Sequence, residues 1–275
     1  EAEFSCTSDS HISVTVKGEG TEKLPQNADN AIAQAALMIY DLAGKSCPGL
    51  QIDCLNRVPL GSGMGSSSAA MLTGMLGANA LLDNPFTDEE ILKLAIETEG
   101  HPDNVAPAML GGLVASILHK NRVVSMRLPT KANHGPIHAT LVLPNFDFPT
   151  SQARAILPKE VNRSDAIYNI SRVVLVTEAL RTGNMELLGI AMKDSLHQPY
   201  RLKLIPGAIS ALEAGKEAGA SAVALSGAGP SLIAFSAKED EKVGVAMKVE
   251  FESAGLSARI FELGTSYEGA EVTII

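Results

Sequence analysis

A run of glycines and serines between a predicted strand and a predicted helix constrains the fold of this chain more than any other feature. Residues 59–68 read PLGSGMGSSS, and two alanines follow. Glycines at alternate positions allow positive φ and let the backbone approach a ligand without a clashing Cβ. Successive N–H groups and the positive end of the next helix favour an anion there. The sequence predicts a loop that binds polyphosphate. An ordinary turn with a serine N-cap is the alternative.

The spacing of this loop excludes three familiar motifs. A Walker A loop needs G-x-x-x-x-G-K-[ST], and no lysine follows here. A dinucleotide fingerprint needs G-x-G-x-x-G, and a nucleophile elbow needs G-x-S-x-G. The chain has G-x-G-x-G instead, so none of the three motifs is present.

Composition narrows the class of protein. The net charge of −9 repels a nucleic-acid backbone, and seven Phe, four Tyr and no Trp leave little for base stacking. Three cysteines without a C-x-x-C pair indicate reduced thiols rather than a disulfide framework or a cysteine-based zinc site. No basic-then-apolar leader or membrane-length apolar run occurs. We therefore expect a soluble, cytoplasmic protein that binds neither nucleic acid nor membrane.

Hydrophobic periodicity predicts mixed strands and helices without strict alternation, which is typical of α+β layers. The best-signalled helix is 87–99, where Thr87 and Glu90 form a T-x-x-E capping box and Gly100 follows. We expect a domain of residues 1–132 and a second of residues 133–275, with a loop around 132–136. Strands are expected at 11–17, 50–57, 113–118 (buried), 138–143, 222–226, 231–236 and 258–263, and further helices at 27–42, 69–82, 164–181, 185–197, 206–218 and 239–254.

The glycine-serine segment, P-x-G-S-G-x-G-S-S-S-A-A, resembles the phosphate-binding motif of the GHMP kinases, named after galactokinase, homoserine kinase, mevalonate kinase and phosphomevalonate kinase. The resemblance implies a two-domain α+β fold, with an N-terminal domain like the second domain of ribosomal protein S5 and a ferredoxin-like C-terminal domain. It also implies ATP and Mg²⁺. The residues expected to bind ATP are Pro59, Leu60, Gly61, Ser62, Gly63, Met64, Gly65, Ser66, Ser67 and Ser68.

Four further blocks resemble the homoserine kinases within that superfamily. They are EGHPDNVAP at 99–107, TSQARAILPK at 150–159, QPYR at 198–201 and LSGAGPS at 225–231. The resemblance implies an enzyme that transfers the γ-phosphoryl group of ATP to the side-chain hydroxyl of L-homoserine. The product is O-phospho-L-homoserine, and the step precedes threonine formation.

Glu99 is the expected carboxylate ligand of Mg²⁺. A helix C-terminus disfavours an anion, so a carboxylate in the last turn makes more sense beside a cation. By resemblance, Glu99 and the hydroxyl of Ser67 hold the metal, and both count as catalytic residues. Glu97 is the fallback ligand, and a solvated helix end is the alternative for Glu99.

His101, Asp103 and Asn104 are expected by resemblance to face the substrate, with Asn104 at the reacting hydroxyl. Three polar residues here could instead cap the next helix. An amide is no useful proton acceptor. Catalysis would then depend on positioning and on electrostatic stabilisation of the transferring group. Asp103 is left open as a base, and we favour a reaction without one.

Arg154 and Arg201 are expected to bind the substrate carboxylate, because a guanidinium presents a planar fork that matches it. Thr150 supports this pocket by resemblance. Gly227 belongs to a close-approach loop, residues 226–231, expected to face the phosphate or the substrate. A tight hairpin between two strands needs the same glycines, and both interpretations can hold.

The resemblance also has limits. The family normally starts with a strand and an Asn-Leu-Gly-Pro-Gly-Phe-Asp-like segment, which the sequence lacks, so we expect residues 1–20 to match the region after it. Two other functions stay open: a GHMP kinase for another small hydroxylated acid, such as shikimate or mevalonate, and a non-catalytic ligand sensor. The expected partners are small molecules, with a homodimer left open.

Overall fold

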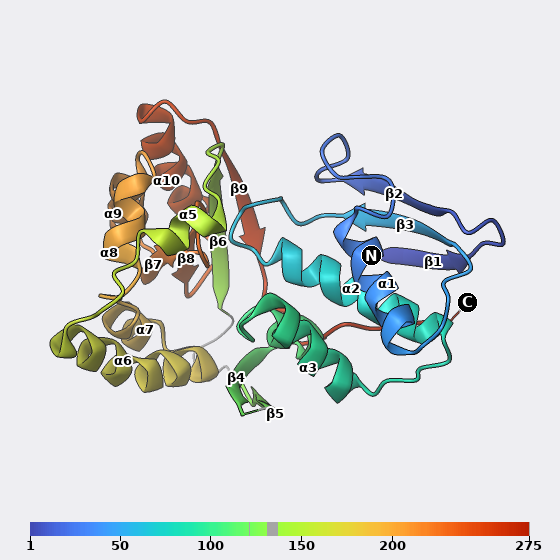
Figure 1. The fold of residues 1–275 in the computed structure, drawn as a ribbon. Coiled ribbons are helices and arrows are strands. Elements are labelled where there is room, and N and C mark those ends of the chain that lie inside the picture. The colour runs from blue at the N-terminus through green and yellow to red at the C-terminus, as the bar shows by residue number, and fades with distance from the viewer. Residues whose placement is uncertain (121, 131–136, 275) are drawn as a thin grey trace. The chain divides into compact units, whose positions relative to one another are not determined.

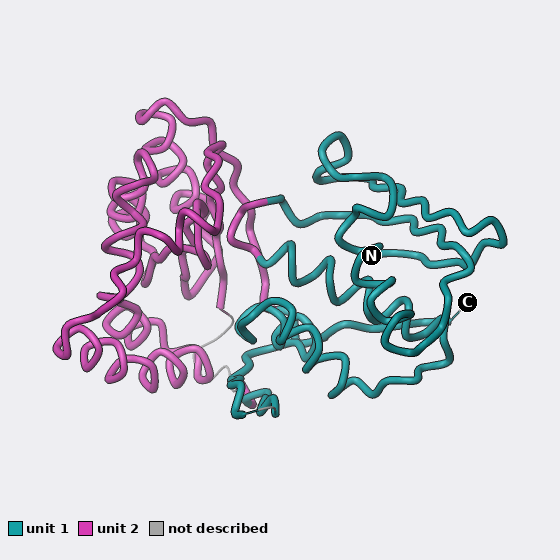
Figure 2. The backbone as a smooth tube through the Cα atoms, viewed as in Figure 1, with its two compact units in different colours: residues 1–60, 65–128, 266–275 teal, residues 61–64, 129–265 magenta. Residues whose placement is uncertain are grey.

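The chain folds into two compact units. The computed structural model describes residues 1–120, 122–130 and 137–274 (Figure 1). Unit 1 consists of Glu1–Leu60, Gly65–Leu128 and Ser266–Ile275, and unit 2 of Gly61–Met64 and Pro129–Thr265 (Figure 2). The expected boundary at 132/133 and its loop lie outside the described residues, so the domain limits stay a prediction.

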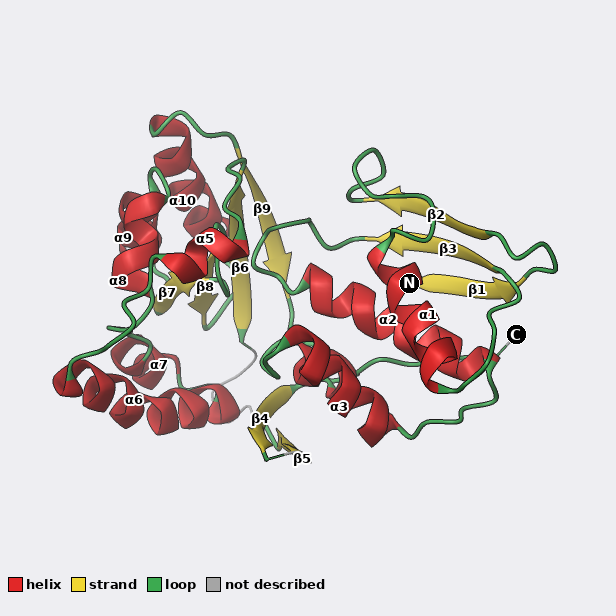
Figure 3. Cartoon of the chain, in the orientation of Figure 1, coloured by secondary structure: helices red, strands yellow, loops and turns green. Residues whose placement is uncertain are grey.

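Unit 1 is built on a three-stranded mixed sheet in the order β1-β3-β2 (Figure 3). Strand β3 (Leu50–Asn56) pairs in parallel with β2 (Ile12–Gly18) and antiparallel with β1 (Ala2–Cys6). Helices α1 (Ala31–Leu42) and α2 (Ser66–Leu81) pack against each other, and α2 contacts β1. A separate strand over residues 2–6 was not expected, although its sequence, AEFSC, alternates apolar and polar residues as a half-buried strand does.

The remainder of unit 1 consists of two helices and a hairpin. Helix α3 (Asp88–Glu99) precedes the short helix α4 (Val105–Leu110), and β4 (Leu113–His119) pairs antiparallel with β5 (Arg122–Leu128). The expectation of a buried strand at 113–118 is wrong about burial. The strand exists, but Ile117 is 59% exposed, because β4 belongs to a two-stranded ribbon whose outer side is uncovered.

Unit 2 contains a four-stranded antiparallel sheet in the order β7-β8-β6-β9. Its strands are β6 (His138–Pro144), β7 (Ala222–Leu225), β8 (Leu232–Ser236) and β9 (Ala258–Leu263). Helices α9 (Ala208–Glu217) and α10 (Glu241–Ser253) pack against each other and against this sheet. The arrangement has the ferredoxin-like β-α-β-β-α-β order, so the α+β class is confirmed.

Four more helices of unit 2 precede α9. They are α5 (Thr150–Ala155), α6 (Arg163–Thr182), α7 (Met185–Ala191) and α8 (Gln198–Arg201), and a short 3₁₀ turn, Leu202–Leu204, follows. The expected helix over 185–197 is wrong in length, since α7 ends at Ala191. Of the helices described here, none is long and apolar enough to cross a membrane.

Each unit has its own apolar core. In unit 1 the fully buried side chains include Ile39, Ile52 and Met75, from α1, β3 and α2. In unit 2, Leu232 and Phe251 occupy the equivalent place between the sheet and its helices. These cores fix the ends of the strands and helices from which the candidate site residues project.

Candidate active site

The three alternating glycines of the predicted phosphate loop all have left-handed backbone conformations. Their φ angles are +60° at Gly61, +75° at Gly63 and +75° at Gly65. A Cβ at Gly63 would stand 2.1 Å from the carbonyl oxygen of Ser226, so any side chain there would clash with backbone. Gly63 therefore allows a close approach to the backbone of the 226–231 loop, and the expected approach to a ligand stays a prediction.

Two hydroxyls of unit 2 hold the first half of this loop. Ser231 Oγ donates to the carbonyl of Ser62 at 2.6 Å, and Ser226 Oγ donates to the carbonyl of Gly63 at 3.0 Å. In a trans peptide the next N–H points opposite to the carbonyl. The N–H groups of Gly63 and Met64 are therefore directed away from the 226–231 loop.

The second half of the loop begins helix α2 in unit 1. Gly65 is the N-cap residue and makes no side-chain cap hydrogen bond, so the serine N-cap considered for this turn is wrong. The first N–H groups of a helix have no partner within it. Ser67 is exposed and Ser66 half-buried, whereas the hydroxyl of Ser68 is buried and has no hydrogen-bond partner among the described residues. Ser67 is thus the most accessible of the three hydroxyls for a metal or phosphate.

Asn104 lies directly beside this loop within unit 1. A Cβ on Gly65 would stand 3.3 Å from Asn104 Oδ1. Asn104 occupies the N-cap position of α4 but makes no side-chain cap hydrogen bond. Its amide therefore faces the phosphate loop and does not cap the helix, which was the structural alternative for this residue.

His101 and Asp103 form a pair in the turn before α4. The ring Nδ1 of His101 is hydrogen-bonded to Asp103 Oδ1. The Asp103 side chain is 73% exposed. One oxygen of the candidate base is therefore already engaged by the neighbouring imidazole.

Glu99 and Glu97, the two candidate metal ligands, differ in burial and in their ion pairs. Gly100, at φ +88°, ends α3 and leaves Glu99 half-buried in the last turn. Glu97 is exposed and pairs with Lys93, with Oε1 and Nζ 2.7 Å apart. Among the described residues, none forms an ion pair or hydrogen bond with the Glu99 carboxylate, so Glu99 is the better candidate.

These groups fit the coordination that Mg²⁺ prefers. A magnesium ion usually takes one or two carboxylates together with phosphate oxygens and waters. Glu99 offers the carboxylate and Ser67 an exposed hydroxyl. No group of three or more His, Cys, Asp or Glu able to hold a metal occurs in the described part of the chain. A metal at this site therefore needs the nucleotide to supply the remaining ligands.

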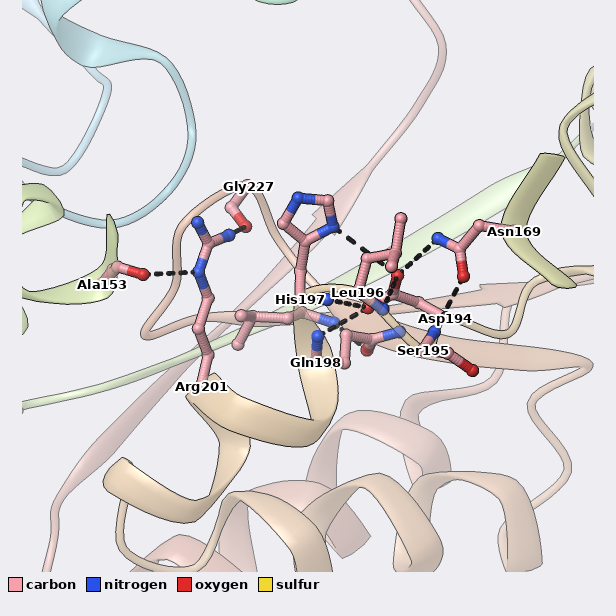
Figure 4. A network of polar contacts seen from close by, with 10 residues as sticks. Ala153, Asn169, Asp194, Ser195, Leu196, His197, Gln198, Arg201 and Gly227 are labelled. Carbon is pink, nitrogen blue, oxygen red and sulfur yellow. Dashed lines mark hydrogen bonds and ion pairs between the residues drawn. The ribbon is translucent and has the colours of Figure 1, made fainter. Parts of the chain in front are cut away.

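Arg201 is the most buried charged residue among the predicted substrate contacts, at 9% exposure. Its Nε donates to the carbonyl of Ala153 at 2.9 Å and its Nη1 to the carbonyl of Gly227 at 3.4 Å (Figure 4). Burial lowers the pKa of Arg201; Asp194 opposes that change, and the positive charge of Arg154 adds to it. The two arginines are therefore close enough to repel, as expected at a site that binds an anion.

Thr150 and Arg154 lie one turn apart on α5, so both project from the same face of that helix. Both are exposed. Ala153, between them in sequence, accepts the hydrogen bond from Arg201. Unit 2 thus brings together Arg154, Arg201, Gly227 and Gly63, and Thr150 lies one turn from Arg154 on α5.

The sequence assigned no role to Asp194, nor to Gln198, although Gln198 belongs to the QPYR block. The Oε1 of Gln198 accepts a 2.9 Å hydrogen bond from the N–H of Leu225, next to the 226–231 loop. Asp194 accepts from the N–H groups at the start of α8. An acidic residue shortly before a helix start is a recognisable signal, but the expected continuous helix over 185–197 concealed it.

Comparison with known families agrees with this fold and loop. Residues 30–112 match the family "GHMP kinases N terminal domain", and residues 176–252 match "GHMP kinases C terminal". With the loop geometry described above, these matches define the chain as a kinase of the GHMP class.

Individual relatives narrow the family further. A homoserine kinase of Moorella thermoacetica is 41% identical over 266 residues, covering 97% of this chain and 88% of the relative. One of Carboxydothermus hydrogenoformans is 40% identical, covering 94% and 84%. The crystal structure of a homoserine kinase from Cytophaga hutchinsonii superimposes with a TM-score of 0.84 at 30% identity, covering 98% and 86%. The chain belongs to the homoserine kinase family.

Proposed function

We propose that this chain transfers the γ-phosphoryl group of ATP to the side-chain hydroxyl of L-homoserine, giving O-phospho-L-homoserine and ADP. The step precedes threonine formation. One observation carries the proposal: Asn104 Oδ1 lies 3.3 Å from the Cβ position of Gly65, which places the candidate acceptor-orienting residue beside the phosphate loop. The family membership supports the same reaction.

Each half of the loop has a role toward the nucleotide. The N–H groups of Gly63 and Met64 and the uncapped start of α2 donate to phosphate oxygens. Glu99 and Ser67 would hold Mg²⁺ together with the phosphates, and the metal would supply neutralisation of the charge on the transferring group. The remaining residues of the segment, including Pro59, Leu60 and Ser62, shape the loop.

The binding of the acceptor, homoserine, depends on two positive charges of unit 2. Arg154 and Arg201 bind the α-carboxylate of homoserine, supported by Thr150 and Gly227. Asn104 and His101 orient the amino-acid substrate so that its hydroxyl oxygen meets the γ-phosphorus. A P–O bond to that oxygen forms as the bond to the ADP oxygen breaks, and the hydroxyl proton is released to water. Positioning supplies most of the catalysis.

The test is an acceptor comparison. Release of ADP is measured with homoserine, shikimate and mevalonate under identical conditions, and homoserine is expected to give the highest kcat/KM. A preference for mevalonate or shikimate would overturn the substrate assignment. Absence of ADP release with every acceptor would favour a non-catalytic sensor.

The carboxylate pocket is tested with arginine variants. Arg154→Ala and Arg201→Lys are expected to raise the KM for homoserine roughly 10- to 100-fold, because hydrogen bonds between charged groups contribute about 1.5–3 kcal/mol. The control is Arg181→Ala, which removes an arginine paired with Glu178 on the surface of α6. An unchanged homoserine KM in both pocket variants contradicts the assignment.

Two broader expectations belong to this proposal. The three cysteines are free thiols, which fits a reducing compartment such as the cytoplasm. A homodimer stays a prediction, tested by the molar mass of the purified chain in solution.

A further inference from the structure

The carboxylate of Asp194 is the centre of a hydrogen-bond network in unit 2 that the proposed mechanism does not use (Figure 4). Its Oδ1 accepts from Asn169 Nδ2 at 2.7 Å and from the N–H of Leu196 at 2.9 Å. Its Oδ2 accepts from the N–H groups of His197 and Gln198, at 2.8 and 2.6 Å. A carboxylate with this many donors has little capacity left for a substrate.

Asn169 also holds the segment between α7 and α8 that contains Asp194. It lies on α6, and its Oδ1 accepts from the N–H of Ser195 at 2.9 Å while its Nδ2 donates to Asp194. One amide therefore holds two consecutive residues of the segment between α7 and α8. That segment is tied to α6 by hydrogen bonds that are specific in direction, because the amide donates on one side and accepts on the other.

Asp194 remains ionised in this environment. Its side chain is only 16% exposed, and burial by itself would raise its pKa. Hydrogen bonds from Asn169 and the three backbone N–H groups outweigh that effect and lower the pKa below its ordinary value. The network therefore places a full negative charge under the first turn of α8.

The charge of Asp194 and the turn that it holds before α8 both affect Arg201. Asp194 favours the charged guanidinium of Arg201, against burial and against the repulsion from Arg154. The N–H groups of Leu196, His197 and Gln198 set where α8 begins, and Arg201 is the last residue of that four-residue helix. Any shift of the α8 start would displace Arg201 from the carbonyls of Ala153 and Gly227.

We propose that Asp194, held by Asn169, is a positioning residue for the carboxylate-binding arginine: it fixes the start of α8 and compensates the charge of Arg201 so that the guanidinium stays aimed at the substrate. The inference rests on the proposed function, since Arg201 is assigned there to the homoserine carboxylate. Asp194 touches no substrate atom itself and acts only through Arg201.

A matched control separates positioning from simple helix capping. Asp240 caps α10 in the same unit, accepting a 3.0 Å hydrogen bond from the N–H of Lys242. Asp240→Asn and Asp194→Asn both alter an aspartate at a helix start. Only Asp194 is linked to the arginine of the proposed pocket.

The experiment compares KM values for both substrates in full-length variants. Asp194→Asn is expected to raise the KM for homoserine about tenfold or more, while the KM for ATP stays at the wild-type value. Asp240→Asn is expected to leave both KM values unchanged, although its thermal midpoint falls. In the double variant Asp194→Asn/Arg201→Ala, the homoserine KM is expected to equal that of Arg201→Ala alone, because coupled residues are not additive.

The results have distinct meanings. A wild-type chain without homoserine-dependent ADP release contradicts the proposed function. A wild-type chain with that activity, combined with an unchanged homoserine KM in Asp194→Asn or an additive double variant, overturns only the positioning role. If circular dichroism finds Asp194→Asn unfolded, Asn169→Ala decides instead, since it removes one hydrogen bond of the carboxylate and keeps the other three. An unchanged homoserine KM in that variant also overturns the proposal.

Discussion

The side-chain hydroxyl of Ser231 donates a 2.6 Å hydrogen bond to the backbone carbonyl of Ser62, a residue 169 positions earlier in the chain. Both residues are at most 1% exposed. This bond, with the parallel one from Ser226 to Gly63, joins the first half of the phosphate loop to the turn between β7 and β8. The first half of the phosphate loop and the 226–231 loop, recognised separately in the sequence, are thus one structural element of unit 2.

Loss of that bond should weaken nucleotide binding. Ser231→Ala removes the hydrogen bond that the buried hydroxyl donates to the carbonyl of Ser62, which costs about 0.5–1.5 kcal/mol of stability. We expect a lower unfolding midpoint in urea and a higher KM for ATP. Ser236→Ala, at another buried serine near β8, serves as control and should leave the ATP KM unchanged. An ATP KM equal to the wild-type value in Ser231→Ala speaks against the role of the bond.

Two glycines of the loop should respond differently to alanine. A Cβ at Gly61 meets nothing within 4 Å, so Gly61→Ala costs only the about 1–2 kcal/mol of a left-handed residue. A Cβ at Gly63 would lie 2.1 Å from the Ser226 carbonyl oxygen, so Gly63→Ala must also move backbone. We expect the larger rise in ATP KM and the larger loss of stability in Gly63→Ala. Equal effects in the two variants would mean that the close approach of Gly63 to the Ser226 carbonyl does not affect ATP binding.

The candidate metal ligand can be tested with two glutamates that lie two residues apart on α3 and differ in their partners. Glu99→Gln removes a carboxylate that pairs with none of the described residues, and we expect kcat with Mg²⁺-ATP to fall roughly 100-fold or more, since a metal contributes several kcal/mol to the transition state. Glu97→Gln breaks only the pair with Lys93 and should retain kcat. Titration of activity against Mg²⁺ should show a raised requirement in Glu99→Gln. The reverse pattern would assign the metal to Glu97.

The pH dependence of stability should reveal the ionised state of Asp194. Its pKa in the folded chain is lower than the about 3.9 of an unfolded aspartate. The ionised form therefore stabilises the fold at neutral pH, and this stabilisation is lost as the pH falls from about 4 through the folded-state pKa. Urea unfolding should give a difference between wild type and Asp194→Asn that is largest near pH 7 and shrinks below about pH 4. A constant difference over that range contradicts the expectation.

Local signals predicted many elements of this fold because the responsible interactions are close in sequence. The capping box of α3 forms as expected: Thr87 Oγ1 accepts from the Glu90 N–H, and Glu90 accepts from the Thr87 N–H. Gly100 ends that helix in a left-handed conformation. Strand β9 has the predicted bounds, residues 258–263. Each of these depends on residues within a few positions of one another.

Elements that depend on distant partners were missed or misjudged. Strand β1 carries a local signal, the alternation in AEFSC, but its pairing with β3, about fifty residues later, joins distant segments. The segment after α7 is hydrogen-bonded to Asn169 on another helix, where the sequence predicted a continuous helix over 185–197. The burial expected for β4 is wrong because the described residues leave Ile117 and Leu118 exposed. No window of the sequence contains these long-range contacts.

The sequence by itself determined the chemistry offered: three glycines that tolerate positive φ, serines at a helix start, Glu99 at a helix end, and arginines able to bind a carboxylate. These properties belong to residue type and near neighbours. Only the tertiary structure decided which groups meet. It pairs Glu97 with Lys93 and gives Glu99 no partner among the described residues, places Asn104 beside Gly65, and buries Arg201 against Ala153 and Gly227. The reason is physical: hydrogen bonds and burial between distant segments are set by how the cores pack, and local sequence does not encode them.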